Sequence, residues 1–228
     1  MKLIIANKNY SSWSMRPWVL LKEFKIHFEE VKISFEPEND FSERVRSINP
    51  IGKVPIVIDD DDFAIWDSLA IVEFVSEKFK NLNIWPENFH DRARARCLCA
   101  EMHAGFQSLR QLCPMNIDAD LSSIGPELFN KYPQLVKDLE RFDQIASDCK
   151  NSGPFLFGKF CAVDAYFSPI AMRITRYGLP MSVKCKKYVD ALCNLESVCT
   201  WVNDAVQEKQ FLSCEELYRK SFTDLPTI

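Results

Sequence analysis

The sequence lacks the features that mark membrane proteins and nucleic-acid-binding proteins. The apolar run after Met1 is too short for the core of a signal peptide, and no stretch approaches the length of a membrane span. Positive charge is not in excess, because 28 basic residues are balanced by 32 acidic residues and the net charge is −4. We therefore expect a cytoplasmic protein that binds neither membranes nor nucleic acids.

Disulfide and metal-site patterns are also missing, although the chain contains nine cysteines. Their number is odd, no C-x-x-C pair occurs, and the three histidines do not stand at zinc-finger spacing from a cysteine pair. In an intracellular protein, most such cysteines stay reduced and pack as small apolar residues. We expect neither a bound metal nor a disulfide framework.

The first 80 residues alternate strand and helix signals. Apolar residues make up 47% of the 228 residues, which is enough for a sizeable core. The periodicity predicts strands at 3–6, 28–35, 55–58 and 63–66, and helices at 16–24, 40–48 and 68–79. An acidic turn, Asp59–Asp62, favours a hairpin between the last two strands. The predicted order is βαβαββα.

The rest of the chain has helical periodicity after a linker-like stretch that contains Pro86. We expect helices at about 89–112, 126–149, 163–177, 183–193 and 195–206. The sequence therefore predicts an α/β domain over residues 1–80 and an all-helical domain over residues 89–228.

Three segments among the first 71 residues place hydroxyls or backbone N–H groups at chain turns, where a small anion can bind. They are Asn9–Ser12, Asn49–Pro55 and Trp66–Ile71. A free thiol has a pKa of about 8.5, and only its thiolate is a good nucleophile. A hydroxyl at a helix start, such as that of Ser11 or Ser12, can stabilise a bound thiolate. The same geometry also serves simple helix capping.

These segments resemble those of the soluble glutathione S-transferases, and Asn9–Trp18 is most similar to bacterial serine-type members and the zeta class. The resemblance covers essentially the whole chain and rests on Asn49-Pro50-x-Gly52-Lys53-Val54-Pro55, Asp67-Ser68-x-Ala70-Ile71 and Gly158-x-Phe160-Cys161-x-x-Asp164-Ala165. It implies a thioredoxin-like first domain, a helical second domain and a homodimer. It also implies glutathione as co-substrate, whose thiol is conjugated or exchanged with a small apolar electrophile in a detoxification reaction.

The resemblance further implies which residue activates the thiol. In the family the catalytic Ser or Cys precedes an Arg by five residues, and Arg16 thereby selects Ser11. Ser12 and Tyr10 are the alternatives. Asp164 belongs to a helix-capping box with Cys161, to which we assign a folding role.

Five residues are expected to hold the tripeptide. We expect Val54-Pro55 to be a cis peptide that turns the Val54 backbone towards the cysteinyl part of glutathione. Lys53 is expected to pair with the glycyl carboxylate, although a solvated lysine is an equal alternative. Asp67 and Ser68 are expected to meet the γ-glutamyl ammonium and carboxylate, with N-capping as a compatible second role.

The electrophile would be held by the helical domain. His103, Phe106 and Arg110 are expected on its first helix, facing the cleft, with Met115 and Tyr177 as further candidates. Each of these has a structural alternative in core or interface packing.

Three functions stay open at this point. The first is a glutathione transferase, the second a glutathione-dependent isomerase in which the thiol adds and then leaves, and the third a non-catalytic glutathione-binding or interaction protein of the same fold. Zeta enzymes carry Ser-Ser-Cys where this chain has Ser11-Ser12-Trp13, which counts against a maleylacetoacetate isomerase. No cysteine precedes Arg16, which disfavours disulfide exchange.

Overall fold

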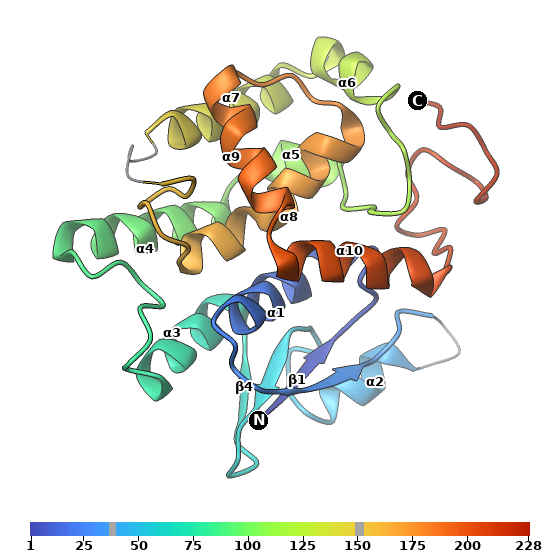
Figure 1. Cartoon of the computed structure of the whole chain (residues 1–228). Helices are drawn as coiled ribbons and strands as arrows, with labels where there is room; N and C mark the ends of the chain where they lie inside the picture. Colours follow the sequence, from blue (N-terminus) through green and yellow to red (C-terminus); the bar gives the residue numbers. More distant parts are fainter. Residues whose placement is uncertain (37–39, 149–152) are drawn as a thin grey trace.

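The computed structural model describes residues 1–36, 40–148 and 153–228. A mixed sheet with its helices is followed by a helical part (Figure 1). The elements of the first part are β1 (Lys2–Ile5), α1 (Ser12–Glu23), β2 (Glu29–Lys32), α2 (Phe41–Arg46), β3 (Ile56–Ile58), β4 (Ala64–Trp66) and α3 (Ser68–Lys78). The predicted order βαβαββα is confirmed, with shorter strands than the apolar runs indicate.

The sheet has the strand order β2-β1-β3-β4. Strands β1 and β2 are parallel, whereas β3 is antiparallel to both β1 and β4. The predicted hairpin joins β3 to β4, and the Asp59 carboxylate shapes its turn by accepting the N–H groups of Asp61 and Phe63. This arrangement places the end of β1 beside the start of β3, next to the loops that carry the candidate site.

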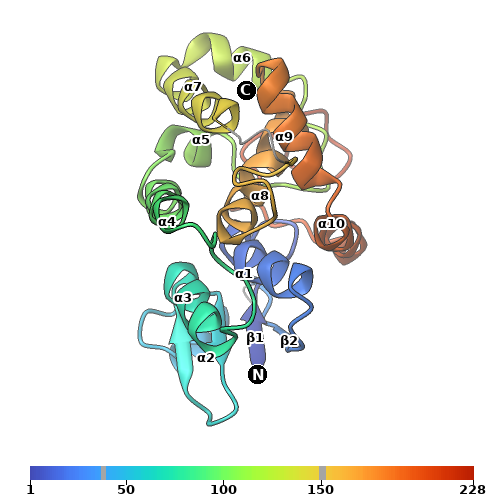
Figure 2. The same cartoon turned by 60° about the vertical axis from the view of Figure 1, so that its left-hand side comes forward.

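The two faces of the sheet are buried against different helices because successive strand side chains point to opposite faces. Leu3, Ile5 and Val57 belong to the large core that also contains the apolar side chains of α1 and α3. On the other face, Ile4 and Ile56 pack with residues of α2. The face with α1 and α3 also meets the helical part of the molecule (Figure 2).

The helical part contains α4 (Phe89–Ala104), α5 (Gln107–Leu112), α6 (Gly125–Lys131), α7 (Pro133–Ser147), α8 (Ala162–Tyr177), α9 (Val183–Cys193) and α10 (Glu196–Glu208). The bounds of 1–80 and 89–228 for two domains stay a prediction. No helix of the residues described here is long and apolar enough to cross a membrane. Eight cysteines are described, four of them buried; Cys149 lies outside the described residues.

Two long predicted helices are wrong, because each is divided into two. Residues 89–112 break at Gly105, which has extended backbone, and at Phe106, which has a left-handed φ of 55°. Residues 126–149 break at Tyr132, whose backbone is extended at φ −120° and ψ 94°. Pro133 explains this second break, because proline disfavours helical backbone in the residue before it and begins a new helix well. The predicted end of this helix at Cys149 lies outside the described residues.

Helix α8 lies at the centre of the molecule, between α1 and the outer helices (Figure 2). Its start is held by the predicted capping box, in which the Asp164 carboxylate accepts the Cys161 N–H over 2.9 Å. The same carboxylate accepts the N–H of Leu156 and the hydroxyl of Tyr188. Complete burial nevertheless raises the pKa of Asp164 to about 6. Because α8 is buried along most of its length, its polar side chains are aimed at other parts of the protein rather than at solvent.

Candidate functional site

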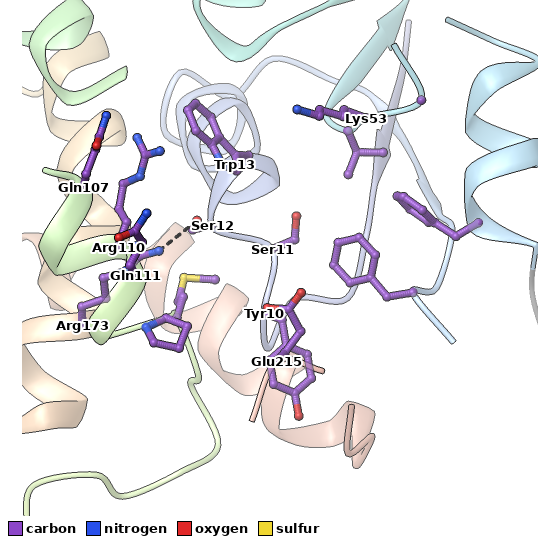
Figure 3. Close-up of a pocket in the computed structure, with 16 residues that line it drawn as sticks. Tyr10, Ser11, Ser12, Trp13, Lys53, Gln107, Arg110, Gln111, Arg173 and Glu215 are labelled. Carbon is purple, nitrogen blue, oxygen red and sulfur yellow. Dashed lines mark hydrogen bonds between the residues drawn. The ribbon is translucent and has the colours of Figure 1, made fainter. Parts of the chain in front are cut away.

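A cavity of about 620 Å³ opens between the start of α1 and helix α5 (Figure 3). It is lined by Tyr10, Ser11, Ser12, Trp13, Phe35, Phe41, Gly52, Lys53, Val54, Gln107, Arg110, Gln111, Pro114, Met115, Arg173 and Glu215. The wall therefore combines the turn before α1, the loop before β3, α5 and its C-terminal loop, α8 and the C-terminal segment.

A second cavity of about 350 Å³ adjoins the first. Trp13, Lys53, Val54 and Arg110 line both, so the two cavities form one continuous cleft. The second is completed by Ile51, Pro55, Trp66, Asp67, Ser68 and His103.

The sequence-predicted site residues thus divide between the two cavities, with two exceptions, Phe106 and Tyr177. Phe106 lines neither cavity. It lies at the break between α4 and α5 with left-handed backbone, and its ring is buried in the hydrophobic core. Tyr177 is likewise a core residue, and its hydroxyl donates to the Pro114 carbonyl. The expected electrophile-pocket roles of Phe106 and Tyr177 are therefore not supported by their positions, whereas Met115 does line the first cavity.

The two serines at the start of α1 differ in their hydrogen bonds. Ser11 Oγ donates to Ser14 Oγ over 2.7 Å, so its proton is already engaged. Ser12 Oγ instead accepts a hydrogen bond from Nη2 of Arg173, at 3.2 Å (Figure 3). The hydroxyl hydrogen of Ser12 has no acceptor among the residues that the structure describes. Ser12 is therefore the serine that can donate to a ligand without losing an existing bond.

The hydroxyl of Tyr10 is held by the segment after α10. It lies 2.8 Å from the Glu216 carboxylate and accepts the Leu212 N–H at 3.3 Å. Glu216 is itself paired with Arg219 over 2.7 Å. The ring of Tyr10 is 5% exposed and points away from Lys53 (Figure 3), and burial raises the pKa of its hydroxyl. These contacts assign Tyr10 to the attachment of the C-terminal segment.

Two arginines give the first cavity a positive wall. Arg173 is buried, and its guanidinium donates to the carbonyl groups of Cys113 and Pro169 as well as to Ser12. Burial, with Arg16 nearby, lowers the pKa of Arg173 to about 10, so it is still charged at neutral pH. Arg110 donates to the carbonyl groups of His103 and Gly105 at the end of α4. Neither arginine forms an ion pair within the described part of the chain. The acidic residue on this wall is Glu215, whose pKa is raised by burial.

The loop before β3 is shaped by Asn49. Its side-chain oxygen accepts the N–H groups of Ile51 and Gly52, and its amide donates to the Lys53 carbonyl over 2.9 Å. Gly52 has a φ of 66°, which favours glycine at this turn. The Val54-Pro55 peptide is cis, as predicted. Both cavities are lined by Lys53, which forms no ion pair with any described residue.

Asp67 and Ser68 lie at the start of α3. One Asp67 carboxylate oxygen caps the helix by accepting the Leu69 N–H, and the other lies 3.3 Å from Nε2 of His103. Nδ1 of His103 is buried and has no hydrogen-bond partner among the residues that the structure describes. Ser68 is 1% exposed, and its hydroxyl lies 2.9 Å from that of Tyr166 on α8. The second cavity therefore offers a carboxylate, a hydroxyl and a helix start within one small space.

The arrangement suits a small ligand with several charges. Among the described residues, no group of three or more His, Cys, Asp or Glu side chains could hold a metal ion. The first cavity presents cations and amides, and the second presents Asp67 and Ser68. An anion placed near Ser12 would meet a hydroxyl donor, the N-terminal end of α1 and two arginines.

Comparison with known proteins shows what the chain is similar to. Residues 10–78 match the glutathione S-transferase N-terminal domain family. A zeta-class glutathione S-transferase from Euphorbia esula is 25% identical over 183 residues, which cover 79% of this chain and 80% of that protein. The chain is thus similar to glutathione S-transferases, with zeta-class relatives at low identity. A probable maleylacetoacetate isomerase from Caenorhabditis elegans is 24% identical over 173 residues, 75% of this chain and 77% of its own.

Solved structures show the same glutathione S-transferase fold and confirm the predicted fold class. A glutathione transferase homologue from Burkholderia strain BGR1, with bound glutathione, superimposes with a TM-score of 0.69 at 21% identity. That match covers 90% of this chain and 98% of the other. A bacterial zeta-class maleyl pyruvate isomerase has a TM-score of 0.68 at 19% identity, covering 91% and 98% of the two chains.

Sequence reasoning missed several residues that line or support the cleft, among them Trp13, Arg173, Tyr166 and Glu215. Arg173 carries a recognisable signal, because it is a charge within the otherwise apolar stretch Ile170–Ile174 of a helix. Trp13 stands where the zeta class has cysteine. We interpreted this difference only as the absence of a cysteine and did not expect the indole to line the cleft. For Tyr166 and Glu215 we find no local sequence signal.

Proposed function

We propose that this glutathione S-transferase family protein is an enzyme that binds glutathione along the cleft and activates its thiol at Ser12. The observation that carries the proposal is the hydrogen bond from the charged Arg173 to Ser12 Oγ, in a cavity at the start of α1. A hydroxyl whose oxygen accepts from a cation becomes a stronger donor. Donation to a bound thiolate, next to two cations, lowers the pKa of the thiol.

The tripeptide is placed by the remaining cleft residues. The γ-glutamyl carboxylate meets Ser68 and the start of α3, and its ammonium group meets Asp67. The cysteinyl backbone lies along Val54, and the glycyl carboxylate pairs with Lys53. These roles are part of the proposal and are supported by the shared lining of both cavities.

The second substrate in this proposal is a small electrophile that carries a carboxylate. The wall beyond Ser12 is formed by Gln107, Gln111, Arg110 and Arg173, which is too polar and too positive for the apolar electrophile expected at first. The thiolate attacks the electrophilic carbon and forms a C–S bond. Either a leaving group departs with its electron pair, or a C=C bond accepts the pair and is then protonated.

An isomerase is the second candidate, because the arginines Arg110 and Arg173 favour an unsaturated carboxylate. In that reaction the thiolate adds to a C=C bond, the resulting single bond rotates, and the thiolate leaves again. Glutathione is then regenerated instead of consumed. Two relatives are named as isomerases, which supports testing this reaction. The homodimer, the cytoplasmic location and a detoxification role are further expectations from the family.

The test begins with the thiol itself. Thiolate absorbance of bound glutathione is titrated against pH in the wild type and in the variants Ser12→Ala, Ser11→Ala and Tyr10→Phe. We expect Ser12→Ala to raise the thiol pKa and the other two to change it little. A shift confined to Ser11→Ala would reassign the role to Ser11. If none of the variants moves the titration, thiol activation by this turn is wrong.

The reaction is then assigned by following glutathione. Carboxylate-bearing and neutral electrophiles are offered at equal concentration, with consumption of thiol and of electrophile measured separately. Turnover that consumes thiol supports a transferase, and turnover at constant thiol supports an isomerase. Tight binding of glutathione without any turnover would favour the non-catalytic alternative.

A further inference from the structure

Arg16 on α1 is a buried cation without a counter-ion. It is 1% exposed, and its Nε and Nη1 atoms have no hydrogen-bond partner among the described residues. The guanidinium lies 4.0 Å from the ring centroid of Trp13 and 4.6 Å from that of Tyr166. Burial lowers its pKa to about 10, so the group is charged at neutral pH. An unpaired buried charge is costly to the folded protein, which suggests that the charge has a use.

Tyr166 connects this cation to the second cavity. Its ring faces Arg16, while its hydroxyl lies 2.9 Å from Ser68 Oγ. Either hydroxyl can donate at this distance, but a phenol is a much stronger acid than an aliphatic hydroxyl, which favours Tyr166 as the donor and Ser68 as the acceptor. The cation over the ring draws electron density from the phenol and strengthens this donation.

This direction leaves the hydroxyl hydrogen of Ser68 available. Ser68 lines the second cavity, so its hydrogen can be donated to a ligand there. A serine that accepts from Tyr166 while donating to a carboxylate forms a chain in which each bond strengthens the next. The positive charge of Arg16 stands behind that chain, with no carboxylate of the described protein to neutralise it.

We propose that Arg16 and Tyr166 are positioning residues that act through Ser68 to bind the α-carboxylate of the γ-glutamyl group. Tyr166 sets Ser68 as a donor towards the cavity, and Arg16 supplies the positive potential that the carboxylate meets. The inference rests on the proposed function, because glutathione is taken as the ligand.

A purely structural role for Arg16 makes the opposite prediction for stability. If Arg16 only fills space between two rings, replacing it should destabilise the protein and weaken every ligand alike. If it is retained for binding, Arg16→Met should leave the ligand-free protein as stable or more stable, because an uncompensated charge is removed and Met adapts to irregular gaps. The same variant should bind glutathione more weakly.

The experiment compares two ligands by isothermal titration. One is S-methylglutathione, and the other is its analogue with 4-aminobutanoyl in place of γ-glutamyl, which lacks only the α-carboxylate. We expect Tyr166→Phe to weaken the binding of S-methylglutathione about two- to fivefold, because it removes one hydrogen bond from the chain that polarises Ser68. Arg16→Met should weaken the binding of S-methylglutathione by about tenfold or more. Arg16→Lys keeps the charge and should weaken this binding less than Arg16→Met does. Binding of the analogue should not change in any of these variants.

Two further variants sharpen the comparison. Tyr188→Phe removes another buried hydroxyl, one that donates to Asp164, and should change the affinity for neither ligand. In a Ser68→Ala background, Tyr166→Phe should have no further effect on S-methylglutathione, because the residue through which it acts is gone. Thermal unfolding of every ligand-free variant is recorded alongside.

The outcomes separate this inference from the proposed function. Equal weakening of both ligands by Tyr166→Phe or Arg16→Met would overturn the inference, as would a loss of stability that parallels the loss of affinity. If the wild type does not bind S-methylglutathione, the proposed function fails as well. If the wild type binds it and the variants bind it equally well, only the roles of Arg16 and Tyr166 are wrong.

Discussion

Arg173 donates a hydrogen bond from Nη2 to Ser12 Oγ over 3.2 Å, although the two residues are 161 positions apart in the chain. The bond joins the centre of the helical part to the start of α1. It also explains why an arginine is buried within an apolar helix, because two carbonyl groups and one hydroxyl satisfy its three nitrogen atoms.

Replacing Arg173 should have the same chemical consequence as replacing Ser12. We expect Arg173→Lys to raise the pKa of bound glutathione by up to about one unit, equivalent to about 1.4 kcal/mol, because lysine cannot reproduce the three-way geometry. In the double variant with Ser12→Ala, the two shifts should not add. Thiolate absorbance against pH measures all three variants, and fully additive shifts would show that Arg173 acts independently of Ser12.

Tyr10→Phe should affect folding rather than thiol chemistry. The change leaves Glu216 and the Leu212 N–H without the tyrosine hydroxyl, at a cost of about 1–3 kcal/mol in the free energy of unfolding. Urea unfolding gives the stability, and the thiolate titration gives the chemistry. Tyr132→Phe is the matched control, because this residue is partly buried and its hydroxyl has no hydrogen-bond partner among the described residues. A large shift in thiol pKa with unchanged stability would contradict the assignment.

Glu215→Gln should improve turnover of a carboxylate electrophile. Glu215 is the acidic residue of the first cavity, and removing its charge takes away a repulsion on the order of 1 kcal/mol. Because burial raises the pKa of this carboxyl, the wild type should approach the variant as the pH falls and Glu215 becomes protonated. Steady-state kcat/KM against pH tests both points. Glu127→Gln makes the same charge change at an exposed position on α6 and should have no effect.

Asp164 should make the stability depend on pH in the mildly acidic range. Its pKa is raised from 3.8 to about 6 by burial, so between these values the folded state binds more protons than the unfolded state. The stabilisation is therefore complete at about pH 4 and is lost as the pH rises through about 6. Urea unfolding of the wild type and of Asp164→Asn should show a stability difference that changes across this window. A constant difference would mean that the carboxylate is already ionised there.

Much of the first part of the fold could be predicted, because its signals are local. Alternating apolar residues, a polar turn and the Asn49–Pro55 loop each specify structure within a few residues. Pro133 is a local signal for the second helix break, but the apolar periodicity on both sides of it indicated one continuous helix and outweighed that signal. The break at Gly105 depends on Phe106 adopting left-handed backbone, which its side chain does not favour.

The candidate site was harder to predict, because half of it is assembled from distant segments. The serines and the Asp67-Ser68 pair stand in recognisable turns, whereas Arg173 and Glu215 reach the cavity only through tertiary packing. Hydrogen-bond direction is likewise invisible in the sequence. The spacing to Arg16 points to Ser11, yet the packing of α8 against α1 supplies a charged donor to Ser12.

Trp13 has a consequence for how the protein can be observed. Its indole forms part of the wall of both cavities, with His103 edge-on at 5.0 Å and two guanidinium groups over its ring. A molecule entering either half of the cleft changes the polarity around the same fluorophore. The protein thus carries its own optical reporter of occupancy. Its signal combines both halves of the cleft, and adding two ligands in turn separates their contributions.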